Sequence, residues 1–263
     1  MHLDGFLLMN PSFSDSQQWP MELADTPKFW LAYQPIVHIN AAPNTVLAFE
    51  SLLRVQIDGV AHGPANIVAA AETDGSIISI DRWVLNEAIR QAIARPHLNV
   101  WINASQISIA HPSFLKDALR ALTASGTLGR MTFEITETAD VDAAVLAERL
   151  SAVKAGKLSL VIDDVRDGFA KRSLLKNDAV AGCKLSRETT SELHVSERVR
   201  AEVQRLVKHC RLTGKRVVLE GVENAYDLKM ATNLGIEYCQ GYHFGHPTEP
   251  ENLQCFSEMR LAE

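Results

Sequence analysis

Seven short apolar runs in this chain each end on a residue that could bind a metal ion or a proton. In chain order the residues are Glu50, Asn103, Glu134, the pair Asp163 and Asp164, Lys184, Glu220 and Gln240. The runs are spaced by roughly 20 to 50 residues, with helical patterns between them. A (β/α) barrel brings residues that are distant in sequence to one mouth, at the carboxyl ends of its strands. The recurrence therefore predicts an enzyme active site.

The five carboxylates of this set could not share a small volume without compensation. Like charges at close range return protons to the carboxylates and raise their pKa values. One or two divalent cations would resolve the conflict. Because the side chains offer oxygen ligands, Mg²⁺ or Mn²⁺ suits them better than zinc, which favours histidine or cysteine.

The composition limits the class of protein. At 263 residues the chain suits one large domain, and its net charge of −6 argues against binding of a nucleic-acid polymer. Its four cysteines lack CxxC spacing, so we expect reduced thiols in a cytoplasmic protein; they are Cys183, Cys210, Cys239 and Cys255. No apolar run reaches the roughly 20 residues that span a bilayer, and we expect no association with a membrane.

The elements that must position the site alternate between strand and helix patterns. The strands are expected at 29–39, 45–55, 97–103, 131–136, 158–163, 180–184, 216–220 and 237–242, and the helices at 64–71, 81–94, 112–123, 141–155, 191–212 and 225–234. Asp81 is expected to be an N-cap, and Gly214 a residue that follows a helix end. Only a turn-forming segment, 40–44, separates the first two strands, which favours a hairpin with the opening strand antiparallel to the rest. The fold class is an α/β, TIM-type (β/α)₈ barrel over residues 29–263, after a leader of residues 1–28 that is flexible or serves for docking.

The motifs around these residues resemble those of a known family. They are Tyr33-Gln34-Pro35-Ile36-Val37, Glu50-Ser51-Leu52-Leu53-Arg54, Asn103-Ala104-Ser105, Glu134-Ile135-Thr136-Glu137, Asp163-Asp164, Glu220-Gly221-Val222-Glu223 and Gln240-Gly241-Tyr242. In this order they resemble the EAL-domain cyclic di-GMP phosphodiesterases, over roughly residues 30–248. One tetrapeptide would be weak evidence, whereas an ordered set at barrel spacing is strong.

The resemblance implies a two-metal phosphodiesterase that opens cyclic di-GMP to linear pGpG. Glu50, Asn103, Glu134 and Asp163 would hold one ion, and Asp163, Asp164 and Glu220 the other. The resemblance also gives roles to residues around the metals: Lys184 would activate or orient the attacking water, Gln240 would hold that water, Gln34, Leu52 and Arg54 would contact the dinucleotide, and Glu137 and Glu223 would brace the active-site loop. The alternative for Glu137 and Glu223 is charge at a helix N-terminus. A lysine beside two cations would have a lowered pKa.

The sequence also departs from the family pattern. After Asp163 and Asp164 the family usually has Phe-Gly-Thr-Gly, where this chain has Val165-Arg166-Asp167-Gly168. Ser186 and Ala181 replace two family aspartates, and Ser186 cannot hold Lys184 by an ion pair. Two alternatives therefore stand beside catalysis: a module that binds cyclic di-GMP or a regulatory protein without turnover, and a metal-dependent barrel hydrolase of another phosphoester. A second copy of the chain is a further candidate partner, because the family often dimerises through the side with the altered loop.

Overall fold

The computed structural model describes residues 28–41, 45–57, 60–136, 141, 143–165 and 174–253. Within them, eight strands close into a ring in the order β1, β9, β8, β7, β6, β5, β4, β2, and a pairing of β1 with β2 completes it. A short strand, β3, extends the sheet beyond β2. The bounds of the strands are Lys28–His38 for β1, Thr45–Ile57 for β2, Val60–His62 for β3, Val100–Ser105 for β4, Met131–Thr136 for β5, Ser159–Ile162 for β6, Val180–Leu185 for β7, Arg216–Leu219 for β8 and Tyr238–Gln240 for β9. The predicted barrel is confirmed.

The first strand runs against its neighbours. β1 pairs antiparallel with both β2 and β9, whereas the remaining neighbours around the ring, from β2 through β4 to β9, pair in parallel. The connection from β1 to β2 is too short to contain the crossover that parallel strands need. The sequence prediction of an antiparallel opening strand is therefore correct, and the short loop between β1 and β2 is its physical reason.

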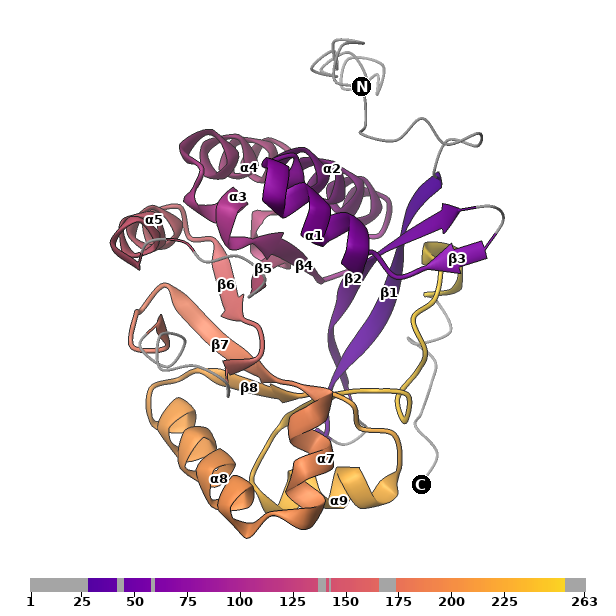
Figure 1. Cartoon of the computed structure of the whole chain (residues 1–263), viewed down its shortest axis with the longest axis vertical. Helices are drawn as coiled ribbons and strands as arrows, with labels where there is room; N and C mark the ends of the chain where they lie inside the picture. The colour runs from indigo at the N-terminus through magenta and orange to yellow at the C-terminus, as the bar shows by residue number, and fades with distance from the viewer. Residues whose placement is uncertain are drawn as a thin grey trace.

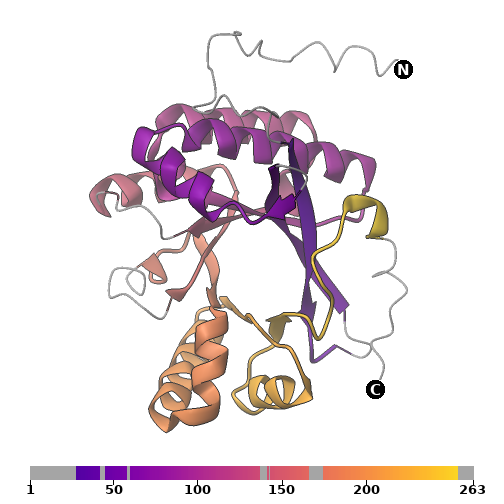
Figure 2. The same cartoon turned by 45° about the vertical axis from the view of Figure 1, so that its right-hand side comes forward.

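The helices lie around the outside of the strands. Figure 1 shows α1 to α4 together on one side of the barrel and α7 to α9 on the opposite side, and Figure 2 shows the same grouping after a turn of the view. The bounds are Ala65–Asp74 for α1, Ile77–Ala94 for α2, Gln106–Ala110 for α3, Pro112–Ala124 for α4, Ala143–Ala155 for α5, Arg187–Val195 for α7, Glu197–Leu212 for α8 and Ala225–Asn233 for α9, with short 3₁₀ turns at Leu128–Arg130 and Pro250–Asn252. Within the described ranges, no helix is both long enough and apolar enough to cross a membrane.

Two corrections concern helix boundaries. Asp81 does not cap a helix: α2 already begins at Ile77, and the buried Asp81 carboxylate accepts a hydrogen bond from the backbone nitrogen of Ser105 at 2.9 Å. The single helix predicted over 191–212 is two helices, because Ser196 ends α7 and its hydroxyl caps α8 by accepting from the nitrogen of Val199. The prediction for Gly214 is correct, since it follows the C-cap of α8 with a φ of +68°.

The interior of the barrel is built in layers. A small apolar cluster contains residues that lie two positions before a predicted site residue, such as Ala48, Trp101, Val161 and Val218, and it also contains Ile36. Side chains alternate in direction along a strand, so a residue and the one two positions later point to the same side. The cluster therefore fills the barrel directly beneath the polar site residues. The polar site residues therefore point to the same side of their strands as the cluster residues, one layer above them.

The cysteines take no part in disulfides within the described residues. Cys183, Cys210 and Cys239 are free and buried, as expected for reduced thiols. Cys255 lies outside the described residues, as does nearly all of the predicted leader.

Candidate functional site

The centre of the site is the ammonium group of Lys184, at the end of β7. Its Nζ lies 2.9 Å from Oε2 of Glu50 on β2 and 2.9 Å from Oε2 of Glu134 on β5, and it also contacts Oε1 of Glu220, directly after β8. The lysine side chain is 1% exposed. Four predicted site residues, on or directly after four different strands, therefore meet at one point.

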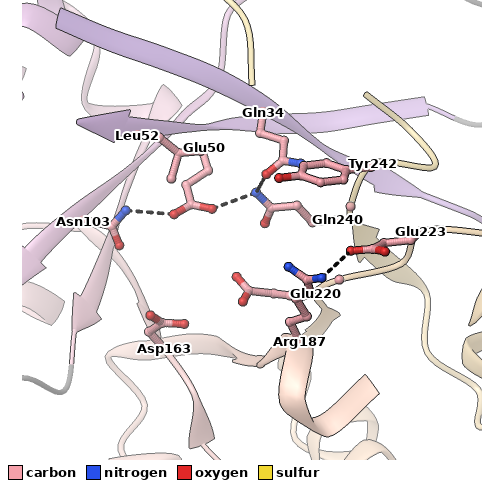
Figure 3. A pocket seen from close by; sticks show the side chains of 12 residues that line it. Gln34, Glu50, Leu52, Asn103, Asp163, Arg187, Glu220, Glu223, Gln240 and Tyr242 are labelled. Atoms are coloured by element: carbon pink, nitrogen blue, oxygen red, sulfur yellow. Dashed lines mark hydrogen bonds and ion pairs between the residues drawn. The ribbon is translucent and has the colours of Figure 1, made fainter. Parts of the chain in front are cut away.

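A second set of contacts surrounds Glu50. Its Oε1 accepts a hydrogen bond from the side-chain amide of Asn103 at 2.8 Å, and its Oε2 accepts one from Gln240 at 2.7 Å. Gln240 also donates to Oε1 of Gln34 at 3.2 Å, and Gln34 donates to the carbonyl of Gly245. Figure 3 shows this chain of amides running from Asn103 to Gln34 across the carboxylate. The amides fix the orientation of Glu50.

The paired aspartates lie at the end of β6. Asp163 lines the pocket, and its Oδ1 accepts a hydrogen bond from the nitrogen of Asp164 at 3.0 Å. Asp164 has a φ of +42°, in the left-handed region that non-glycine residues rarely adopt. Strained backbone of this kind is often found at functional sites. The altered loop over 166–173 and the candidate Glu137 lie outside the described residues.

Burial and crowding shift the pKa values of these groups. Burial raises the pKa of Glu134 well above its usual range, and repulsion from Glu50 adds to it against the attraction of Lys184. Burial likewise raises the pKa of Asp163, and it raises that of Glu220 to about 7. Burial also opposes ionisation of Glu50, but the attraction and the hydrogen bond of Lys184 outweigh it and lower the pKa of Glu50. The site thus holds more negative charge than one ammonium can neutralise.

Among the carboxylates alone, the pKa of Lys184 is raised, and the lowering expected beside two cations stays a prediction. Burial alone would lower it, yet attraction from Glu134, Glu220, Glu50 and Asp163 raises it well above the usual value. The predicted lowering assumed two cations beside the amine. Among the described carboxylates, the ammonium group of Lys184 supplies the positive charge at the centre of the site.

A pocket of about 380 Å³ opens over these residues at the carboxyl ends of the strands. Its lining includes the predicted residues Gln34, Glu50, Leu52, Asn103, Asp163, Glu220, Glu223 and Gln240. Lys184 and Glu134 lie buried beneath it. Arg54, expected to bind phosphate, is not among the lining residues; its Nη1 donates to the carbonyl of Leu53 at 2.9 Å.

The pocket also contains residues that the site prediction missed. Arg187, the first residue of α7, forms an ion pair with Glu223 at 3.0 Å, and Gly221 and Tyr242 complete the mouth. Tyr242 stacks on His246 with ring centroids 4.1 Å apart. Tyr242 belongs to a motif that was recognised, so its position was a usable signal. Arg187 had only its place three residues after Lys184 to indicate it.

The chemistry of the donor set fits divalent cations. The candidate ligands present carboxylate and amide oxygens, and Oε1 of Glu134 is buried with no hydrogen-bond partner in the described part of the chain. A hard cation would satisfy this atom and the excess negative charge together. Among the described residues, however, no group of three or more acidic, histidine or cysteine side chains is already arranged to hold a metal ion. Binding of cations would require the carboxylates to turn from Lys184 toward the metal.

Comparison with known proteins agrees with this architecture. A family model described as the EAL domain matches residues 17–247. The chain is 32% identical over 237 residues to the bifunctional diguanylate cyclase/cyclic di-GMP phosphodiesterase MucR of Pseudomonas aeruginosa, covering 85% of this chain and 33% of that protein. It is 28% identical over 238 residues to the cyclic di-GMP phosphodiesterase NbdA of the same organism, covering 86% of this chain and 30% of that one. The chain thus spans about a third of the length of these relatives.

Solved structures give the same assignment. The PaMucR phosphodiesterase in complex with c-di-GMP superposes with a TM-score of 0.77 at 29% identity, covering 86% of this chain and 94% of that one. A calcium and cyclic di-GMP complex of Klebsiella pneumoniae BlrP1 superposes with a TM-score of 0.72 at 26% identity, covering 88% of this chain and 58% of that one. On the barrel, the ordered motifs and these similarities, the chain belongs to the EAL-domain family.

Proposed function

We propose that this chain hydrolyses cyclic di-GMP to linear pGpG with two Mg²⁺ or Mn²⁺ ions. The observation that carries the proposal is the convergence of Glu50, Glu134, Asp163 and Glu220 around Lys184 beneath one pocket. Relatives named as cyclic di-GMP phosphodiesterases support the choice of substrate.

The proposed ligands are those that the resemblance to the EAL-domain family implies, and their oxygen donors suit a hard divalent cation. Glu50, Asn103, Glu134 and Asp163 would hold one ion, and Asp163, Asp164 and Glu220 the other. When bound, the ions would neutralise charge on the phosphate oxygens and make water more acidic at neutral pH. Within the chain, Gln240 and Asn103 keep Glu50 oriented through hydrogen bonds of 2.7 and 2.8 Å.

Lys184 and the pocket walls would do the remaining work. The lysine amine, at the centre of the site, would orient an attacking water or exchange a proton with it, which typically contributes 10²–10⁴-fold to a rate. Gln34 and Leu52 line the same pocket and would contact the dinucleotide. The buried apolar layer below excludes water from the underside of the site.

The test is turnover of cyclic di-GMP by purified protein with Mg²⁺ or Mn²⁺, with the product identified as pGpG by chromatography. Glu50→Gln should abolish turnover, because it removes a charge from the centre of the site. Glu197→Gln is the matched control, since the side chain of Glu197 is 94% exposed on α8, and it should keep wild-type turnover. Absence of turnover by the wild type at high protein concentration would contradict the proposal.

A second candidate function is binding of cyclic di-GMP without hydrolysis. The observation that favours it is that Lys184 already occupies the centre of the carboxylates, while no metal-ready cluster exists among the described residues. Calorimetry separates the two functions. Binding without turnover that is unchanged by Lys184→Ala would support the binding module, whereas turnover that this variant abolishes would support the hydrolase.

A further inference from the structure

Arg187 is the one cationic side chain among the described residues that line the pocket. The acidic lining residues are Glu50, Asp163, Glu220 and Glu223. Lys184 is buried beneath the pocket, where three carboxylates occupy its ammonium group. A substrate that carries two phosphodiester anions therefore meets a wall whose charged side chains, among the described residues, are all acidic except Arg187.

The stem of Arg187 is held in place by close packing against Gly221. A Cβ built on Gly221 would lie 2.5 Å from Cγ of Arg187, so only a glycine leaves room for the arginine side chain there. Gly221 also has a φ of +66°, which favours glycine. The arginine thus crosses the mouth on a fixed path, and in Figure 3 its guanidinium lies between Glu220 and Glu223.

The guanidinium keeps donors available for a ligand. One nitrogen, Nη2, pairs with Oε1 of Glu223 at 3.0 Å, and the side chain is 64% exposed. A guanidinium has five N–H donors in a planar fork that matches the oxygens of a phosphate. Among the described residues the fork of Arg187 pairs with Glu223 alone, whereas the fork of Arg54 is partly used on the carbonyl of Leu53.

We propose that Arg187 binds the phosphodiester group of cyclic di-GMP that is not being cleaved, and thereby sets the affinity of the pocket for the cyclic dinucleotide. The inference rests on the proposed function. Divalent cations would meet the phosphate at the reacting centre, which leaves the second phosphate in an acidic pocket without a positive partner. Arg187 supplies that partner, and its ion pair with Glu223 holds the guanidinium at the mouth before the substrate arrives.

The experiment measures kcat and KM for cyclic di-GMP with Mn²⁺ in four proteins: wild type, Arg187→Met, Arg187→Lys and Arg198→Met. Methionine keeps an apolar stem over Gly221 and removes the charge, while lysine restores the charge without the fork. Arg198 is the matched control, because it is 86% exposed on α8 and pairs only with Glu202 among the described residues. Thermal unfolding of each variant checks that the barrel is intact.

We expect Arg187→Met to raise KM by about 10- to 100-fold, the effect of losing a charge-assisted hydrogen bond to an anion, with kcat changed by less than about threefold. Arg187→Lys should recover part of the affinity, and Arg198→Met should match the wild type. An unchanged KM in Arg187→Met would overturn the inference. A loss confined to kcat would also overturn it, because that result would mean that Arg187 orients Glu223 or the reacting groups and does not bind the second phosphate.

Failure of the proposed function gives a different result. In that case the wild type itself would leave cyclic di-GMP intact, and the inference would fall with it. If the wild type turns over the substrate and only the pattern among the Arg187 variants disagrees, the proposed function stands and the inference alone is wrong.

Discussion

Replacement of Lys184 by methionine tests the electrostatics at the centre of the site. In the wild type, Nζ of Lys184 lies 2.9 Å from both Glu50 and Glu134 and also contacts Glu220. Methionine keeps a flexible apolar stem of similar length and removes the charge. The variant therefore leaves the buried carboxylates without their positive partner.

The size of the effect follows from burial. Glu134 is fully buried and Glu50 is 6% exposed, so water cannot take over the role of the ammonium. Removal of one partner from a buried ion pair costs about 3–5 kcal/mol. Domains of this kind have a total stability of about 5–15 kcal/mol. The variant should therefore unfold at a much lower urea concentration than the wild type at pH 8.

The effect should depend on pH with a definite sign. Without Lys184, the pKa values of Glu50 and Glu134 in the folded state rise above those in the unfolded state. The folded protein then keeps protons that the unfolded chain loses above about pH 4, and its stability falls as the pH rises through this range. Below about pH 4 the carboxylates are protonated in both states and the penalty is absent. The gap between wild type and variant should widen from pH 5 to pH 8.

Urea unfolding at pH 5 and pH 8, with and without Mn²⁺, measures these quantities. Mn²⁺ should stabilise the variant more than the wild type, because the cation can take the place of the missing ammonium; a concentration of 100 times Kd contributes about 2.7 kcal/mol. Lys208→Met, at an exposed position on α8, is the control. The reasoning is refuted if Lys184→Met lies within about 1 kcal/mol of the wild type at pH 8 without metal, or if Mn²⁺ stabilises both proteins equally.

Two further predictions concern residues that support the barrel. Burial raises the pKa of Asp81 to about 7. Ionisation of this carboxyl should therefore lower the stability of the folded protein as the pH rises from about 4 to 7, by up to about 4 kcal/mol. Asp81→Asn should remove this dependence of stability on pH in urea unfolding from pH 4.5 to 8, and an unchanged dependence would contradict the assignment. Gly241 has a φ of +158°, and a Cβ there would overlap the backbone of Val222, so Gly241→Ala should lower stability by at least about 3 kcal/mol. Gly214→Ala is its control, since φ is +68° but nothing lies within 4 Å, and its cost should stay near 1–2 kcal/mol; equal losses would exclude the overlap as the cause.

The convergence of the site could be predicted because the strands of a barrel share a geometry. Glu50 and Glu134 are 84 residues apart in the chain, but both lie on strands of the barrel and both contact Lys184. The sequence prediction placed Glu50 at the end of an apolar run, whereas β2 continues past it to Ile57. The alternation of side chains along a strand also explains why an apolar residue two positions earlier, such as Trp101 before Asn103, fills the layer beneath. Local pattern was sufficient wherever a residue's direction follows from its own strand.

Tertiary contacts account for most of what the sequence did not reveal. Asp81 looks like an N-cap in isolation, yet it is a buried acceptor for the nitrogen of Ser105, 24 residues away. The apolar periodicity continues across Ser196, so the break between α7 and α8 is visible only in the serine cap itself. Arg187 enters the pocket because Gly221, in the loop after β8, leaves space for it. The contacts of Asp81 and Arg187 join segments that are far apart in the chain, so no periodic pattern of the sequence could indicate them.

The replacement of a family aspartate by Ser186 does not remove the anchor of the candidate catalytic lysine. Lys184 is held by carboxylates on β2 and β5 and just after β8, and none of these contacts involves residue 186. Ser186 instead precedes α7 as its N-cap residue, with its hydroxyl 3.5 Å from that of Thr189. Loss of the acid at position 186 therefore gives no reason to expect a displaced amine. What decides between hydrolysis and binding alone is whether cations can draw the same carboxylates away from that amine, which metal-dependent turnover in the wild type and its loss in Lys184→Ala would establish.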